Sequence, residues 1–267
     1  MKSLNSFGLD LTDCVGITRD NAYNMEKAFN LNQFEDVLNF PCACHSLNLV
    51  FNEVYKAKEP VALIVKKADA IRMLFANSRE RRELLSSEQK KLNLPQQVFP
   101  SPCVTRWWSL HYVLAFLLKN HQTIANSFLD KSKFKQDEVL TYDVQFLATL
   151  FALNFLGSEA VQVSTAMESE SQPTVSFILP FVFNFDKRLD SDVKLAVIAK
   201  AMKLCKVHLS IVDFDEVRTC VEQVFVTFKE SFAAFKSKYV DSKYYDTLAI
   251  ATLLDPRFVK FLNSSFN

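Results

Sequence analysis

The sequence predicts an α+β protein that is predominantly α-helical, and three observations lead to this fold class. The 267 residues include only three glycines, too few for the positive-φ turns of a hairpin-rich β protein. Apolar side chains recur at helical spacing, most clearly from Val217 to Tyr239. Strand-like runs occur only before residue 105. A hydrophobic content of 49% is sufficient for a real core.

Local patterns place the individual elements. β-Branched or apolar runs predict short strands at 15–18, 40–44 and 98–104. Asp20 and Asn21 are good N-cap residues for the first helix, and a proline-containing linker, Leu94 to Pro102, leads into the last strand, which has the character of an edge strand. Helical periodicity predicts helices at 22–31, 46–57, 61–91, 110–128, 143–156, 193–212, 216–239 and 244–254.

Charge and composition exclude several classes of function. With 31 basic and 30 acidic residues the chain has no global field for nucleic acid, so any DNA contact must be a local patch. The scarcity of glycine argues against a glycine-rich phosphate loop or dinucleotide fingerprint. The four histidines have no neighbouring nucleophile motif, so a catalytic triad and a small-molecule substrate are not expected.

The cysteines and the apolar runs indicate an intracellular protein. The six cysteines lie mostly in apolar or helical surroundings, which is typical of buried thiols in a reducing compartment. No signal peptide is visible. The apolar run from Thr174 to Phe185 contains Pro180 and is too short to cross a bilayer of roughly 30 Å, so no membrane partner is expected.

Three short segments carry the most specific signal, and two further segments follow them in the second half of the chain. The first three are Asp20-Asn21-Ala22 with Asn24-Met25, Cys42-Ala43-Cys44-His45 with Leu47-Asn48-Leu49, and Thr105-Arg106-Trp107. The later two are Gln172-Pro173-Thr174 and Leu254-Asp255-Pro256-Arg257-Phe258. Together, and in this order, they resemble the core of the hAT superfamily of DNA transposases.

The resemblance implies a partial ribonuclease-H-like sheet in residues 1–128 and a large all-α insertion domain in residues 129–267. In the family, three strands and the first catalytic Asp precede the Asp-Asn-Ala segment, and the final catalytic Glu and a dimerising region follow the insertion. Neither flank lies within these residues. The chain is therefore expected to be catalytically inactive by itself and to need no cofactor, Mg²⁺ being expected only in a complete active relative.

Asp20 occupies the position of the family's second catalytic carboxylate, beside the motif residue Asn21. Two-metal chemistry needs several carboxylates around ions about 3.5–4 Å apart, so one Asp is not a site. The alternative is a helix cap.

Cys42 and His45 match the family's Cys-x-x-His, which lies beside the active site and near bound DNA. A structural zinc site wants four ligands, and no second Cys/His pair follows at the required spacing, so no metal is assigned. The alternative is a buried thiol and a hydrogen-bonded histidine at a helix start.

Arg106 and Trp107 are the most suggestive pair for DNA. In the family, the Trp of this motif is implicated in holding a base that has been pulled out of the DNA stack. Stacking of a base on an indole is worth about 1–3 kcal/mol. The guanidinium would hold a phosphate. Trp108 stands where an Asn is common, and the alternative is that at least one of the two indoles packs in the core.

The expected function is that of a nuclear, DNA-binding, transposase-derived fragment related to proteins with BED-type zinc fingers. The alternative is a domesticated protein-interaction scaffold in transcription or chromatin regulation, without DNA chemistry. Expected partners are DNA, other proteins, or a second copy through the family's dimerising region.

Overall fold

A computed structural model describes residues 8, 10, 14–20, 23, 24, 27, 37–56, 59–103, 108–135, 142–168 and 174–258 of the chain. The described part is mostly helical and contains one two-stranded parallel sheet. The predicted fold class, predominantly α, is confirmed at this level. The ribonuclease-H-like topology and the parts 1–128 and 129–267 stay predictions.

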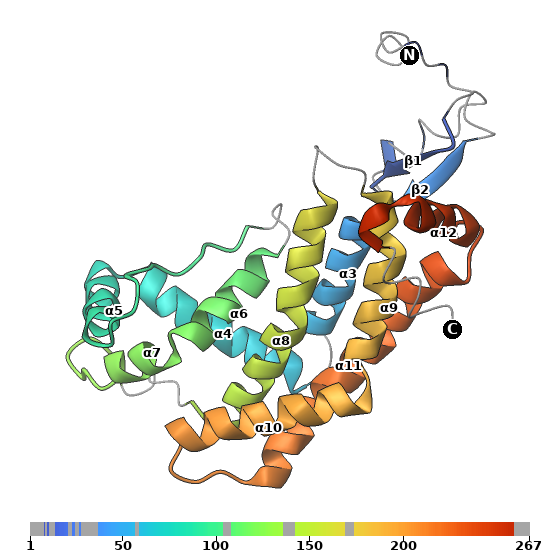
Figure 1. Ribbon diagram of the computed structural model, residues 1–267. Coiled ribbons are helices and arrows are strands. Elements are labelled where there is room, and N and C mark those ends of the chain that lie inside the picture. Colours follow the sequence, from blue (N-terminus) through green and yellow to red (C-terminus); the bar gives the residue numbers. More distant parts are fainter. Residues whose placement is uncertain are drawn as a thin grey trace. The chain divides into compact units, whose positions relative to one another are not determined.

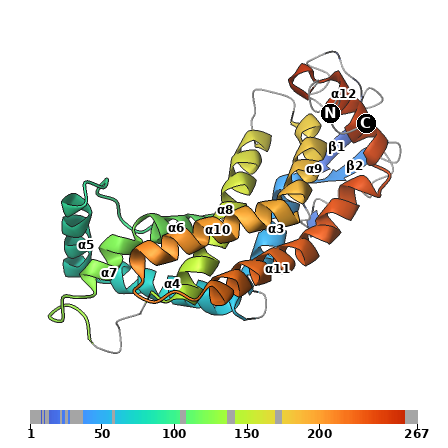
Figure 2. The ribbon, with the colours of Figure 1, turned by 60° about the horizontal axis from the view of Figure 1, so that its bottom comes forward.

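Figures 1 and 2 show the elements in sequence colours. The strands are β1 (Gly16–Arg19) and β2 (Leu38–Pro41). The α-helices are α3 (Ala43–Lys56), α4 (Val61–Ala76), α5 (Arg79–Lys91), α6 (Ser109–Lys119), α7 (His121–Ser127), α8 (Val144–Met167), α9 (Ile178–Arg188), α10 (Ser191–His208), α11 (Phe214–Val240) and α12 (Tyr245–Leu254). Two 3₁₀ turns complete the described elements, η3 (Val175–Phe177) and η4 (Pro256–Phe258).

The chain divides into two compact units, each built from separate stretches of sequence. Unit 1 comprises Met1–Leu49, Ser164–Val182 and Ala234–Asn267. Unit 2 comprises Val50–Val163 and Phe183–Ala233. Unit 1 therefore holds the strand pair and α12, and unit 2 holds α4 to α7, which pack against one another (Figure 2).

Two strand predictions need correction. The second strand ends at Pro41. Of residues 42–44, predicted to continue it, Cys42 directly precedes α3, and Ala43 and Cys44 are the first residues of that helix. The reason is local: the Cys42 carbonyl accepts the N–H of Ser46 at 2.9 Å, and the Cys42 sulfur accepts the N–H of His45 at 3.5 Å, which satisfies donors of a first helical turn. Residues 98–103 form no strand; they follow Pro95 in an extended linker.

Most of the predicted helices are present, but their boundaries differ from the prediction. The predicted helix 61–91 is two helices, because the Ser78 side chain accepts the N–H of Arg81 and starts α5. The predicted helix 110–128 also breaks, at Asn120. A helix over 178–188 was not expected in the apolar run; Pro180 is tolerated because it lies in the first turn of α9. Of the helix predicted at 22–31, Tyr23, Asn24 and Lys27 are helical and the remainder lies outside the described residues.

Among the described residues, α8 is the one helix that is long and apolar enough to cross a membrane, whereas only the apolar run from Thr174 to Phe185 was considered from the sequence. The 24 residues of α8 are enough by length and composition, although 61% of its most apolar window is buried inside the protein, as in a core helix. Gly157 brings α8 close to α6, because a Cβ at this position would overlap the buried imidazole of His111. The expectation of no membrane partner stays a prediction.

Aromatic rings form the centre of unit 2. Phe51 on α3 is almost completely buried and contacts four other rings edge to face. The partners are Tyr55, Trp108, Phe185 and Phe228. Such pairs add about 0.5–1.5 kcal/mol beyond the burial of area. The abundant phenylalanines, 25 in the chain, therefore serve to a large extent as core residues.

Candidate functional site at the carboxyl edge of the strand pair

The parallel register of the two strands brings two of the predicted site residues to one edge. Arg19 pairs with Pro41 at the last position of the ladder, so Asp20 and Cys42 occupy the next step on the two strands. The Cys42 N–H donates to the Arg19 carbonyl at 2.8 Å and closes this end of the sheet. Asp20 is exposed, whereas Cys42 is half-buried. The carboxyl ends of parallel strands are a usual place for functional side chains.

Two side-chain features hold this edge in place. Arg19 donates through Nε to the Asn39 side chain at 2.9 Å, which ties β1 to β2 next to the edge. At the other end, Gly16 leaves the space that the Phe40 ring occupies, since a Cβ there would overlap the ring. Glycine is therefore required at this close approach of a ring to the β1 backbone.

The Cys42 sulfur lies at the N-terminus of the 14-residue helix α3 and is the most unusual titratable group of the site. The Cys44 thiol donates a hydrogen bond to it, and the backbone N–H groups of His45 and Cys44 point at it. These contacts, the Cys44 hydrogen bond foremost, outweigh burial and lower the pKa of Cys42 to about 6. Cys42 is a thiolate at neutral pH on this basis.

The pKa of Cys44 is shifted in the opposite direction to that of Cys42. Cys44 is buried, it contacts the Ser164 carbonyl at 3.7 Å, and its pKa is strongly raised, chiefly by the hydrogen bond to Cys42 and then by burial. His45 follows in the first turn of α3 and is half-buried. The neighbouring charge of His45 contributes to the lowered pKa of Cys42. The two residues of the Cys-x-x-His motif therefore interact directly.

The C-terminal end of α11 adds three polar contacts to this site within unit 1. Tyr239 is fully buried and donates its hydroxyl to the Pro41 carbonyl at 3.1 Å, with Ser46 Oγ at 3.4 Å. Lys238 Nζ lies 3.1 Å from the same Ser46 hydroxyl. Burial lowers the pKa of Lys238, and the charge of Cys42 opposes this. A cation and a thiolate thus share the edge that carries Asp20.

Sequence reasoning missed Cys44, Lys238 and Tyr239 as parts of the site. Cys44 was visible as the second thiol of a Cys-x-Cys pair. Lys238 and Tyr239 lie almost 200 positions from Cys42 and carry no motif, so only the tertiary structure brings them there.

The third predicted segment is described only in part. Asn21, Arg106 and Trp107 lie outside the described residues. Trp108 is 6% exposed and packs on Phe51 with ring centroids 4.9 Å apart, so the prediction that one indole belongs to the core is confirmed. Its φ of 64° is rare for a bulky residue, and backbone strain of this kind is common next to functional positions.

Gln172 and Pro173 lie outside the described residues, and the turn that follows Thr174 contacts the last segment of the resemblance within unit 1. Ser176, two residues after the Pro-Thr segment, donates its hydroxyl to Asp255 at 2.6 Å. Arg257 binds the same carboxylate through Nη2 at 2.5 Å and lies over the Phe177 ring. The Arg257 and Ser176 contacts lower the pKa of Asp255. These residues act as a structural link between η3 and the end of α12.

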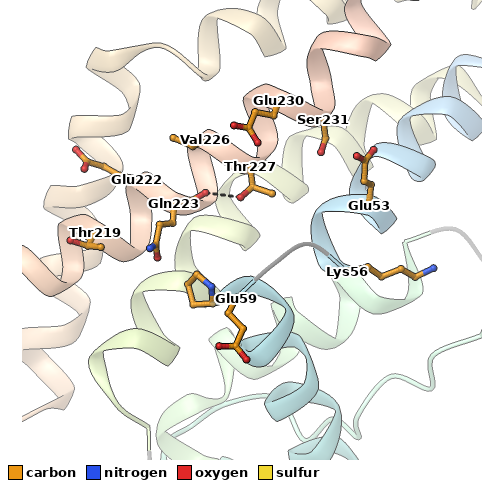
Figure 3. Close-up of a pocket in the computed structure, with 11 residues that line it drawn as sticks. Glu53, Lys56, Glu59, Thr219, Glu222, Gln223, Val226, Thr227, Glu230 and Ser231 are labelled. Atoms are coloured by element: carbon orange, nitrogen blue, oxygen red, sulfur yellow. Dashed lines mark hydrogen bonds between the residues drawn. The ribbon is translucent and has the colours of Figure 1, made fainter.

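A groove of about 750 Å³ lies in unit 2, and none of the predicted site residues is among those that line it (Figure 3). It is lined by α11, by Glu53 and Lys56 on α3, and by Glu59 before α4. Four glutamates, at 53, 59, 222 and 230, surround it, and the single lysine extends away from α11 in Figure 3. Such a surface repels phosphate, so this groove is not a DNA site.

Within the described residues, no group of three or more His, Cys, Asp or Glu side chains is placed to hold a metal ion. The chain matches no family model, no curated protein and no solved structure. The chemistry of the site must therefore be inferred from its own residues.

Proposed function

We propose that residues 1–267 form a DNA-binding fragment derived from a hAT-type transposase and that this fragment does not cleave DNA by itself. The observation that supports the proposal most is the register of β1 and β2, because it places Asp20 and the Cys42-x-x-His45 motif at one carboxyl edge. In the family, the corresponding residues lie beside the active site and near DNA. A nuclear setting and a ribonuclease-H-like ancestry belong to the same proposal.

Lack of cleavage follows from the chemistry of a lone carboxylate. Only Asp20, of three acidic positions that the family uses, is matched within these residues. One carboxylate cannot hold two Mg²⁺ ions about 3.5–4 Å apart. Incubation with Mg²⁺ or Mn²⁺ and a nicked or hairpin substrate should give no product. Cleavage that disappears in Asp20→Ala would contradict this part of the proposal.

DNA binding is tested by substitution of the Arg-Trp pair. Trp107→Ala should weaken binding to single-stranded or distorted ends by about 1–3 kcal/mol and leave fully paired DNA nearly unaffected, since only an unstacked base can use an indole face. Arg106→Ala should weaken binding to both kinds of DNA and reduce the salt slope by about one phosphate contact. Trp108→Phe is the matched control, because Trp108 is buried and should not contact DNA.

An interaction scaffold is the second candidate, and the groove of unit 2 favours it. The groove combines exposed Val226 with an acidic rim, which suits a basic protein segment. No ion pair joins Glu53, Glu59 or Glu230 to another residue in the described part of the chain. If Trp107→Ala lowers thermal stability by several degrees with no selective loss of DNA binding, this second candidate is preferred.

A further inference from the structure

The Cys42–Cys44 pair has features that the DNA-binding proposal does not use. The two thiols are separated by one residue at the start of α3, and one is half-buried while the other is buried. The outer sulfur accepts the His45 N–H at 3.5 Å, and the Cys44 thiol, which also donates to the Ser164 carbonyl at 3.7 Å, lies beside it, so negative charge on this sulfur is stabilised. A thiol in this arrangement is a nucleophile that has a second thiol within reach.

We propose that Cys42 and Cys44 are a peroxide-sensitive thiol pair that closes to an intramolecular disulfide. Cys42 is the attacking thiolate and Cys44 is the resolving thiol. The oxidant is a hydroperoxide. This inference is independent of the proposed DNA-binding function, because it requires only the geometry of the α3 N-terminus.

The reaction consists of two balanced steps. The Cys42 sulfur attacks the terminal oxygen of the hydroperoxide, the O–O bond breaks, and the alkoxide or hydroxide leaves and takes up a proton. Cys42 is oxidised by two electrons to a sulfenic acid, and the peroxide is reduced to an alcohol or water. The Cys44 sulfur then attacks the Cys42 sulfur, the S–O bond breaks, and hydroxide leaves with the Cys44 proton as water. Two thiols and one hydroperoxide thus give one disulfide, one alcohol and one water.

The local geometry allows the bridge. Side chains two apart within a helix point to different faces, but Cys42 precedes the first residue of α3, and its side chain lies beside the Cys44 thiol. The Cα atoms of two residues separated by one helical residue are about 5.4 Å apart, from the rise and radius of the helix. Disulfides bridge Cα separations of roughly 4.4–6.8 Å. Oxidation of Cys42 also makes Cys44 easier to ionise for the second step. The pKa of Cys44 is raised mainly by the hydrogen bond to the Cys42 thiolate, and conversion of Cys42 to a sulfenic acid removes that cause.

Charged and polar groups from several elements face the pair. Lys238 and Tyr239 of α11 lie beside Ser46 on the Cys42 side, and the positive charge of Lys238 favours the thiolate. Glu168, which follows α8, disfavours ionisation of Cys44. Arg19 and Asp20 lie at the adjoining end of β1, and His45 lies on α3 itself. The cationic and donor groups are therefore gathered around Cys42, and the acid lies nearer Cys44.

The other cysteines provide matched controls within the same chain. Cys205 and Cys220 are a second pair of neighbouring thiols, but both are buried and burial raises the pKa of each. Cys103 is half-buried like Cys42 and has no second cysteine near it in sequence. Neither the buried pair nor Cys103 is expected to react as Cys42 does.

The first measurement is the rate of alkylation of each cysteine by iodoacetamide in the reduced full chain, followed by peptide mapping. At pH 5.5, a pKa of about 6 gives Cys42 about 200 times the thiolate fraction of an ordinary thiol with a pKa of about 8.5. Lower intrinsic nucleophilicity reduces this advantage about tenfold. Cys42 should therefore react about 20-fold faster than a small reference thiol with an ordinary pKa. Equal rates would overturn the proposal.

The second measurement is the product formed with stoichiometric hydrogen peroxide. Peptide mapping of the wild-type chain should show a Cys42–Cys44 disulfide, with Cys205 and Cys220 reduced. Cys44→Ser should instead leave a sulfenic acid on Cys42 that dimedone traps, and Cys103→Ser should behave as wild type. If Cys44→Ser does not fold, Cys44→Ala serves the same purpose, and the wild-type mapping needs no variant. Oxidation of other cysteines first, or only intermolecular disulfides at Cys42, would overturn the proposal.

Discussion

A cluster of buried aromatic rings lies at the centre of unit 2, whereas the contacts around the candidate site in unit 1 are polar and join segments that are distant in sequence. Phe51 alone contacts four rings in unit 2. In unit 1, Tyr239 binds the Pro41 carbonyl, Ser176 binds Asp255, and Cys44 contacts the Ser164 carbonyl. The difference indicates where chemistry can take place: Cys42, whose pKa is lowered mainly by hydrogen bonds, lies in unit 1 at the carboxyl edge of the strand pair, whereas the pKa of His111 in unit 2 is lowered by burial.

The largest expected effect is on the aromatic core of unit 2. Phe51→Ala should lower the free energy of unfolding by about 3–5 kcal/mol, since it removes a nearly fully buried ring and leaves a cavity. Phe214→Ala is the control, because that ring is 50% exposed and its loss should change stability by less than about 0.5 kcal/mol. Chemical denaturation measures both. Equal losses for the two variants would refute the importance given to the ring cluster.

Acid should destabilise unit 2 through His111. Burial lowers the pKa of His111 from 6.5 to about 4, so between these values the unfolded chain binds a proton that the folded chain does not. Stability is therefore full above pH 6.5 and falls as the pH drops toward 4, by about 3 kcal/mol at most. Burial also lowers the pKa of His121, with the same sign. Denaturation of His111→Gln against pH should show a shallower fall than the wild type, and identical profiles would contradict the assignment.

Close packing of α8 on α6 predicts a smaller loss. Gly157→Ala should cost about 1–3 kcal/mol, because the new methyl group overlaps the His111 ring. The double variant Gly157→Ala with His111→Ala should lose less free energy of unfolding than the two single variants lose together, because the smaller side chain at position 111 makes room for the methyl group. Strict additivity in a double-mutant cycle would show that the two positions do not meet.

The smallest effect is expected in the polar network of unit 1. Tyr239→Phe keeps the buried ring and removes the hydroxyl that donates to the Pro41 carbonyl, so it should cost about 1 kcal/mol. Tyr112→Phe is the control, because Tyr112 is 47% exposed. If Tyr239→Phe lowered the free energy of unfolding as much as Phe51→Ala does, the stability of unit 1 would depend on this one contact. The expected difference between the polar contacts of unit 1 and the aromatic core of unit 2 would then be contradicted.

Short-range patterns in the sequence predicted much of the fold. The stripe from Val217 to Tyr239 lies within α11, and the β-branched run at 15–18 lies largely within β1. The positions at which one helix ends and the next begins depended on single polar residues. Ser78, for example, caps the start of α5, and the apolar periodicity of the sequence gives no sign of this break. Of the strand predicted at 98–104, residues 98–103 form no strand, because an apolar pair after a proline is equally compatible with a linker, and residue 104 lies outside the described residues.

The site could be predicted only in its local part. Asp20, Cys42 and His45 were found from motifs, and the parallel register then placed the first two at one edge. The roles of Lys238 and Tyr239 could not be predicted from the sequence, because their contacts with Ser46 join positions more than 190 residues apart. The pKa of Cys42 likewise depends on a hydrogen bond from Cys44 and on helix geometry, which no residue type specifies alone.

The proposed binding of DNA by this chain is best tested through the salt dependence of the binding constant. The equilibrium constant of residues 1–267 for a duplex with an unpaired end should be measured from about 50 to 200 mM salt, since each neutralised phosphate contributes about −0.9 to the slope of log K against log salt. We expect a linear fall with a slope steeper than about −2, reduced by about one in Arg106→Ala. No binding, or a slope indistinguishable from zero, would contradict the DNA-binding account and favour the interaction scaffold.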